Sequence, residues 1–182
     1  ILNIAKIGRR YFVLNAFDGV LTSLGILIGT FLANVENATI VVSATVGAAI
    51  ALSFSGVWGA YLTENAERGK ELKELERILY TKLKKTKLGR ATRAASIILA
   101  LVNGVAPFTA VLVIISPFFF AGSFAGINDV YYTSFSIAFL ILASLGAFLG
   151  RISKENIFNS AAKMVLVGIA CVIVITLVGK FF

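Results

Sequence analysis

The chain contains five apolar stretches, each long enough to cross a lipid bilayer as a helix. A helix rises about 1.5 Å per residue, so about 20 residues cross the roughly 30 Å hydrocarbon core. Of the 182 residues, 58% are hydrophobic and only 14% are charged, whereas about a quarter of a soluble domain is charged. We therefore expect an all-α, multi-pass integral membrane protein, with residues 1–182 forming a single transmembrane domain. The expected spans are residues 11–33, 39–61, 94–120, 132–149 and 157–177.

Basic residues are concentrated in alternate connections between these stretches. Several precede the first stretch, ten lie within 68–93, and two lie between the last two stretches. The other two connections contain the acids Glu36 and Asp129 but no Lys or Arg. Because cytoplasmic loops carry an excess of Lys and Arg, we expect a cytoplasmic N-terminus. The C-terminus, with Lys180, is then expected on the far side.

Composition excludes several kinds of chemistry. The chain has no His, one Cys and one Met, which excludes a disulfide framework and a multi-Cys metal cage. A bound metal ion would depend mainly on oxygen donors, with Met164 and Cys171 as the only soft ones. No nucleophile–base pair or phosphate-binding loop occurs, so we expect no enzyme activity and no permanently bound cofactor. The net charge of +8 is interpreted as setting membrane orientation, not as binding nucleic acid.

Asp18 is the only acid in the first apolar stretch. A carboxylate in the hydrocarbon layer costs about 2.5–3.5 kcal/mol on insertion scales, and it usually marks a pathway for ions or protons. A helical wheel advances about 100° per residue. The polar and small residues that fall on the stripe of Asp18 are Asn15, Thr22, Gly25, Gly29 and Ala33.

This stripe has two interpretations. Small residues spaced by four, from Gly25 through Gly29 to Ala33, let two transmembrane backbones approach closely. The contact could lie within one chain, with Asp18 hydrogen-bonded to a neighbouring helix. Alternatively it is a homodimer seam, which would place two Asp18 carboxylates around a shared axis where they bind a cation or a proton.

The charged segment 62–93 follows the second stretch without a turn signal. Residues 60–88 contain no Pro and a single Gly, so we expect the helix of the second span to continue as a cytoplasmic amphipathic helix. Four acids fall within an arc of about 80° on its wheel: Glu64, Glu67, Glu71 and Glu74. Such a face could collect divalent cations. It could equally be a solvated helix with internal pairs such as Glu64–Arg68.

The third stretch contains Asn103 and Pro107 near its middle. Proline removes a backbone donor and kinks a helix, which frees carbonyl groups within the membrane. Those carbonyls and the Asn103 amide could coordinate a passing cation. Helix packing alone is the alternative explanation.

Taken in order, these motifs resemble the vacuolar iron transporter family, whose five-span members exchange Fe²⁺ or Mn²⁺ for protons. The resemblance extends over nearly the whole chain. It is carried by Asn15-Ala16-Phe17-Asp18-Gly19-Val20-Leu21-Thr22-Ser23, Ala51-Leu52-Ser53, Gly59-Ala60-Tyr61, Glu67-Arg68 with Glu71 and Glu74, Gly104-Val105-Ala106-Pro107, and Gly146-Ala147 with Arg151.

The resemblance implies roles for particular residues. Asp18 would line a translocation path at a dimer interface, and Glu71 and Glu74 would gather metal on the cytoplasmic extension. The chain departs from the family at Ala60, where Glu is usual, and at Phe54, where Met is common. The cytoplasmic connection is also shorter than in the family.

Together, the residues and the resemblance predict a homodimeric, proton-coupled antiporter that moves Fe²⁺ or Mn²⁺ out of the cytoplasm. Asp18 would be the coupling carboxylate, assisted by Asn15, Thr22, Asn103 and the carbonyls around Pro107. The alternatives are a non-transporting scaffold whose cytoplasmic helix docks a partner, and a passive cation channel. We expect the plasma membrane as the location if the source is a prokaryote. Because the sequence begins at Ile1 and not at Met, further N-terminal residues are also expected.

Overall fold

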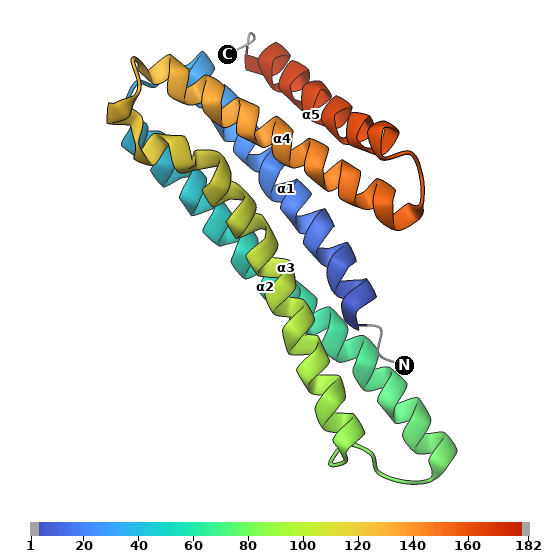
Figure 1. Cartoon of the computed structure of the whole chain (residues 1–182). Helices are drawn as coiled ribbons and strands as arrows, with labels where there is room; N and C mark the ends of the chain where they lie inside the picture. The colour runs from blue at the N-terminus through green and yellow to red at the C-terminus, as the bar shows by residue number, and fades with distance from the viewer. Residues whose placement is uncertain (1–3, 180–182) are drawn as a thin grey trace.

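The computed structural model describes residues 4–179 and is all-helical there (Figure 1). All five long helices have the length and apolar composition needed to cross a membrane. This confirms the prediction of an all-α, multi-pass integral membrane protein. Lys180 lies outside the described residues. The helices are α1 (Ile4–Leu32), α2 (Ala38–Leu79), α3 (Lys87–Phe119), α4 (Ile127–Ser153) and α5 (Ile157–Gly179), with a short 3-10 helix, η1 (Ala121–Ser123), between α3 and α4.

Two hairpins flank the first helix. Figure 1 shows α2 and α3 as a long antiparallel pair on one side of α1, with α4 and α5 on the other. Helix α2 has 42 residues, about 63 Å at 1.5 Å per residue, so it is longer than the hydrocarbon layer is thick. The α2–α3 turn projects past the other helices, and we call this end of the molecule the hairpin end. The opposite end, with the α1–α2 turn and the α3–α4 connection, is the loop end.

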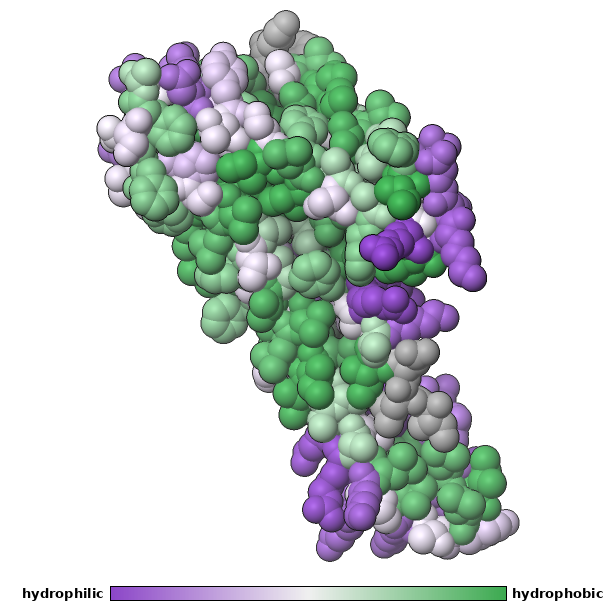
Figure 2. Space-filling view, viewed as in Figure 1, coloured by the Kyte–Doolittle hydropathy of each residue, from purple (hydrophilic) through white to green (hydrophobic). Residues whose placement is uncertain are grey.

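The hydrophobic core lies where α1, α3 and α4 meet. Leu24 and Leu27 of α1 and Leu142 of α4 are fully buried in it. Near the loop end, the ring of Tyr131 packs edge-on against Phe118 and Phe31, with centroids 5.0 and 5.3 Å away. Helices α2 and α5, by contrast, bury little of their surface within the chain. Figure 2 shows apolar side chains over much of the middle of the molecule, with hydrophilic ones at its two ends and along the side where the α4–α5 turn lies.

Two glycines set the close contacts of α3 with its neighbours. A Cβ placed on Gly19 of α1 would lie 2.8 Å from the Cα of Pro107. One placed on Gly104 would lie 2.6 Å from the carbonyl oxygen of Ser53 in α2. Real Cβ atoms do not approach backbone atoms so closely, so neither position accepts a side chain without displacing a helix.

The helix of the second span continues beyond the apolar stretch, as expected, but it is shorter than the sequence predicted. Helix α2 ends at Leu79, not near Leu88, and Tyr80 takes a left-handed backbone conformation with φ 50°. The Glu76 carboxylate then accepts hydrogen bonds from the backbone N–H groups of Leu83 and Lys84, at 2.6 and 3.0 Å. The turn forms because these carboxylate bonds replace those that a continuing helix would make. Thr86 then caps the N-terminus of α3.

Candidate functional site

Asp18 lies at the midpoint of α1, fourteen residues from each end of the helix. Its side chain is exposed on the surface of the single chain. The core-facing residues Ala16 and Val20 are buried on another side of the helix. Within residues 4–179, no hydrogen bond or ion pair involves the Asp18 carboxylate. A group that is costly in hydrocarbon therefore lacks a partner in its own chain.

The residues that continue the stripe of Asp18 toward the loop end are also at least partly exposed in the single chain. Gly29 is exposed, and a Cβ placed there would meet no atom within 4 Å. One placed on Gly25 would meet only the Ile175 side chain, at 3.7 Å. Thr22 is half-buried, and its hydroxyl makes no hydrogen bond within the described chain, whereas the neighbouring Ser23 donates to the carbonyl of Gly19 at 2.8 Å. Together with the exposed Ala33, these residues leave a small-residue surface around Asp18.

Asn15 and Asn103 are brought together by the fold. The Asn15 amide donates to the Asn103 side-chain oxygen and, at 2.9 Å, to the carbonyl of Tyr11. The Asn103 amide donates in turn to the carbonyl of Gly56 in α2, at 2.8 Å. This polar chain ties α1, α2 and α3 together near the middle of the apolar region.

Asn103 and Pro107 lie between helices and do not share the exposed face of Asp18. Both are buried, and Pro107 is in close contact with Gly19. The backbone oxygen of Asn103, which lacks a donor because Pro107 has no N–H, lies against Gly56. Helix α3 continues through Pro107. These two residues therefore hold α1 against α3 and do not lie on the Asp18 stripe.

The four glutamates that were predicted to collect metal ions do not share one environment. Glu64 is only 5% exposed and accepts hydrogen bonds from the Tyr11 hydroxyl and the Arg68 Nε, each at 2.8 Å. The other three, Glu67, Glu71 and Glu74, are exposed. Between residues 4 and 179, no three His, Cys, Asp or Glu side chains lie close enough to hold a metal ion together. Glu64 thus belongs to a contact between helices.

Sequence reasoning missed Tyr11 as a partner of Glu64. The Glu64–Arg68 pair was visible from its spacing, and the structure forms it with a distance of 2.8 Å. Tyr11, however, is 53 residues away from Glu64. No local pattern connects two positions so far apart, and only the packing of α1 on α2 does so.

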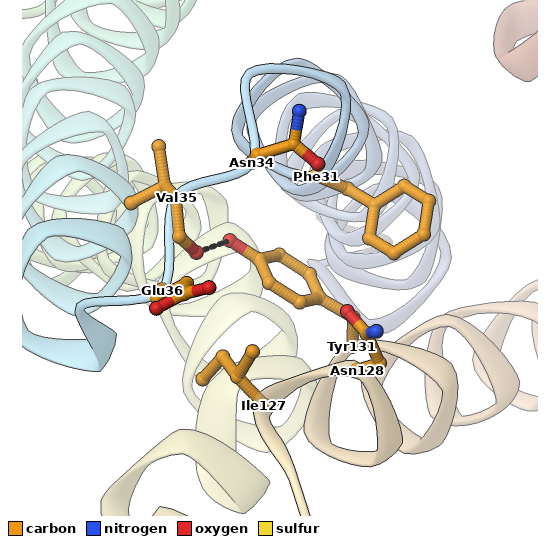
Figure 3. A pocket seen from close by; sticks show the side chains of 7 residues that line it. All are labelled: Phe31, Asn34, Val35, Glu36, Ile127, Asn128 and Tyr131. Carbon is orange, nitrogen blue, oxygen red and sulfur yellow. Dashed lines mark hydrogen bonds between the residues drawn. The ribbon is translucent and has the colours of Figure 1, made fainter.

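A second polar region lies at the loop end and was also missed. A pocket of about 120 Å³ opens between the α1–α2 turn and the start of α4 (Figure 3). Its polar residues are Asn34 and Glu36 on the turn, and Asn128 and Tyr131 on α4. The available signal was weak: Glu36 is the only charged residue in residues 34–38.

The chain has a relative among archaeal proteins. It is 32% identical to an uncharacterized protein of Methanocaldococcus jannaschii, MJ0645, over 178 residues that cover 96% of the chain and 90% of the relative. No protein-family model matches the chain.

Proposed function

The chain belongs to the same family as the Methanocaldococcus jannaschii protein, and we propose that it transports a divalent transition metal, Fe²⁺ or Mn²⁺, in exchange for protons. The protein would work as a homodimer and export the metal from the cytoplasm. One observation carries this proposal: an exposed carboxylate without a partner, at the middle of a membrane-length helix.

The first step concerns what covers Asp18. Left in lipid, its carboxylate would cost about 2.5–3.5 kcal/mol or more. Its own chain supplies no partner within the described residues. A second copy that apposes the same face would exclude lipid and bring two Asp18 carboxylates to one two-fold axis. Two such carboxylates in a low-dielectric seam retain a divalent cation or a proton, which is the basis of exchange.

The second step concerns whether two copies can approach. Gly25, Gly29 and Ala33 continue the stripe of Asp18 toward the loop end, and the surface over Gly29 is open. Small residues at this spacing allow close contact between transmembrane backbones. The stripe therefore has the shape that a two-fold contact requires.

The third step concerns the auxiliary ligands. The hydrogen bond to Asn103 fixes the Asn15 amide, and within residues 4–179 the Asn15 side-chain oxygen makes no hydrogen bond. The Thr22 hydroxyl, one turn beyond Asp18, is equally unused. Both oxygens suit Mn²⁺ or Fe²⁺ as weak neutral ligands. Asn103 and Pro107 then assist by holding α1 in place.

The fourth step concerns direction. The positive-inside rule places the N-terminus and the hairpin end in the cytoplasm. On the part of α2 beyond the apolar window, Glu67, Glu71 and Glu74 are exposed and make no ion pair within residues 4–179. In this arrangement they form the polar face of a cytoplasmic amphipathic helix. They would raise the local cation concentration at the entrance to the seam.

The test is coupled flux in liposomes that contain the purified protein and a pH-sensitive dye. A Mn²⁺ gradient should drive proton movement in the opposite direction with the wild-type protein, and Asp18→Asn should reduce both fluxes to the level of empty liposomes. Asp129→Asn, which neutralises an exposed acid at the loop end, is the matched control and should transport normally. Equal coupled flux in Asp18→Asn would remove Asp18 from the mechanism. Metal flux without proton movement would favour the passive channel.

The dimer seam has its own test. Cys171 is the only cysteine, so Cys171→Ser provides a cysteine-free background. In that background Gly29→Cys should form a disulfide between two copies under mild oxidation. Leu140→Cys, on the exposed face of α4, should not. Cross-linking at Leu140 but not at Gly29 would place the contact elsewhere.

A scaffold role is the second candidate function, because the hairpin end exposes apolar side chains. Ile78 and Leu79 are more than half exposed, and Tyr80 is 96% exposed. A soluble partner could cover them. This role predicts that the full-length protein binds no Mn²⁺ by calorimetry and captures a soluble protein that Leu79→Asp releases.

A further inference from the structure

The pocket at the loop end is lined by oxygen-bearing residues from two segments far apart in the sequence, together with the apolar side chains of Phe31 and Ile127. The α1–α2 turn supplies Glu36, the Asn34 amide and the Val35 carbonyl, and α4 supplies Asn128 and Tyr131. The Tyr131 hydroxyl donates to the Val35 carbonyl at 2.9 Å. Figure 3 shows the Glu36 carboxylate beside this hydrogen bond. Carboxylate, amide, carbonyl and hydroxyl oxygens are the ligands of hard divalent cations.

The charge at this end favours a cation. Residues 33–38 and 120–131 contain two acids, Glu36 and Asp129, and no Lys or Arg. The N-terminus of α4 carries a partial positive charge, and Asp129 lies in the first turn where it offsets that charge. Glu36 is therefore the one charged side chain among the described residues that line the pocket.

Two of the lining oxygens, the Tyr131 hydroxyl and the Val35 carbonyl, are held in place before any ligand binds. Tyr131 is only 1% exposed, because its ring is enclosed by Phe31 and Phe118. The turn is closed by a hydrogen bond from the Val35 N–H to the Thr30 carbonyl, at 3.0 Å. Because these two oxygens are already ordered, their part in binding costs less conformational entropy.

We infer that this pocket binds a hard divalent cation of the Mn²⁺ or Ca²⁺ type, with Glu36 as the charged ligand. One carboxylate among neutral oxygens corresponds to a weak site, with a Kd of about 10⁻⁴–10⁻³ M. Binding stands independently of Asp18. The pocket's use as a release site for exported metal rests on the proposed function.

The experiment uses Tb³⁺, an oxygen-seeking probe that luminesces when a nearby tyrosine is excited, with full-length protein in detergent. We expect Tb³⁺ luminescence that Mn²⁺ and Ca²⁺ displace. Glu36→Gln should weaken Tb³⁺ binding about tenfold, because the site loses its charged ligand. Asn34→Gly suits the left-handed backbone at this position, φ 53°, and removes one neutral donor, so it should weaken binding about threefold.

Two controls separate this site from the rest of the molecule. Asp129→Asn removes the other acid at this end, which does not line the pocket, and should leave binding within about twofold. Asp18→Asn should lose coupled flux but keep the part of the Tb³⁺ luminescence that Glu36→Gln reduces. Full binding by Glu36→Gln, or equal losses in Glu36→Gln and Asp129→Asn, would overturn the inference. Normal Tb³⁺ binding by a wild-type protein that moves no metal would leave this site standing and reject the proposed transport.

Discussion

Asp18 lies on α1, and Glu64 lies on α2 where it contacts α1. The two carboxylates have opposite environments. Glu64 is 5% exposed and is held by Tyr11 and Arg68. Asp18 is exposed and has no partner within residues 4–179. An acid satisfied by its own chain stabilises that chain. An acid left unsatisfied in a membrane-length helix needs something from outside the chain, and for this reason we place the site there.

The largest expected effect is that of a substitution at Asp18. Asp18→Asn should reduce coupled Mn²⁺ and proton flux to background, because the neutral amide cannot exchange a proton for a cation. The same substitution should leave the melting temperature in detergent unchanged, since no contact within the chain is lost. A large fall in melting temperature together with the loss of flux would show that Asp18 is structural.

The opposite behaviour is expected at Glu64. Glu64→Ala leaves the Arg68 guanidinium buried without its partner, which costs about 3–5 kcal/mol of stability. Chemical denaturation in detergent measures this cost. Glu71→Ala, on the exposed part of α2, is the matched control and should change stability by less than about 0.5 kcal/mol. Replacing both partners, Glu64→Leu with Arg68→Leu, should recover most of the loss.

Two of the glycines of α1, Gly19 and Gly29, extend the comparison to helix packing. Gly19→Ala places a methyl group 2.8 Å from Pro107 and should destabilise the fold by about 1–3 kcal/mol. Gly29→Ala meets nothing within 4 Å in the single chain, so denaturation of the monomer should not change. If the stripe is a dimer seam, Gly29→Ala instead shifts the monomer–dimer equilibrium toward monomer in analytical ultracentrifugation. An unchanged equilibrium would argue against the seam.

The smallest expected effect is at Tyr11. Tyr11→Phe removes one hydrogen bond to Glu64 and leaves the Arg68 ion pair in place. The expected loss is about 1 kcal/mol, measured by the same denaturation. A loss as large as that of Glu64→Ala would mean that Tyr11 and not Arg68 compensates the buried charge.

Much of the architecture was readable from local patterns. Apolar runs of membrane length predicted the five helices, because backbone groups in a bilayer must be paired within a helix. The end of α2 was not readable, because the Glu76 carboxylate reaches forward to Leu83 and Lys84. A wheel of residues 62–88 assumes that the helix continues, and it cannot detect a side chain that replaces the helical bonds.

The candidate site shows the same division. The sequence alone determined that Asp18, Thr22, Gly25 and Gly29 share one stripe, because helical geometry depends only on spacing. Only the tertiary structure decided that this stripe faces outward, that Glu64 is withdrawn from the other glutamates, and that Glu36 meets Tyr131 across a pocket. The physical reason is that exposure and pairing depend on which helices pack together, and contacts between residues 53 or 96 positions apart leave no periodic trace in a sequence.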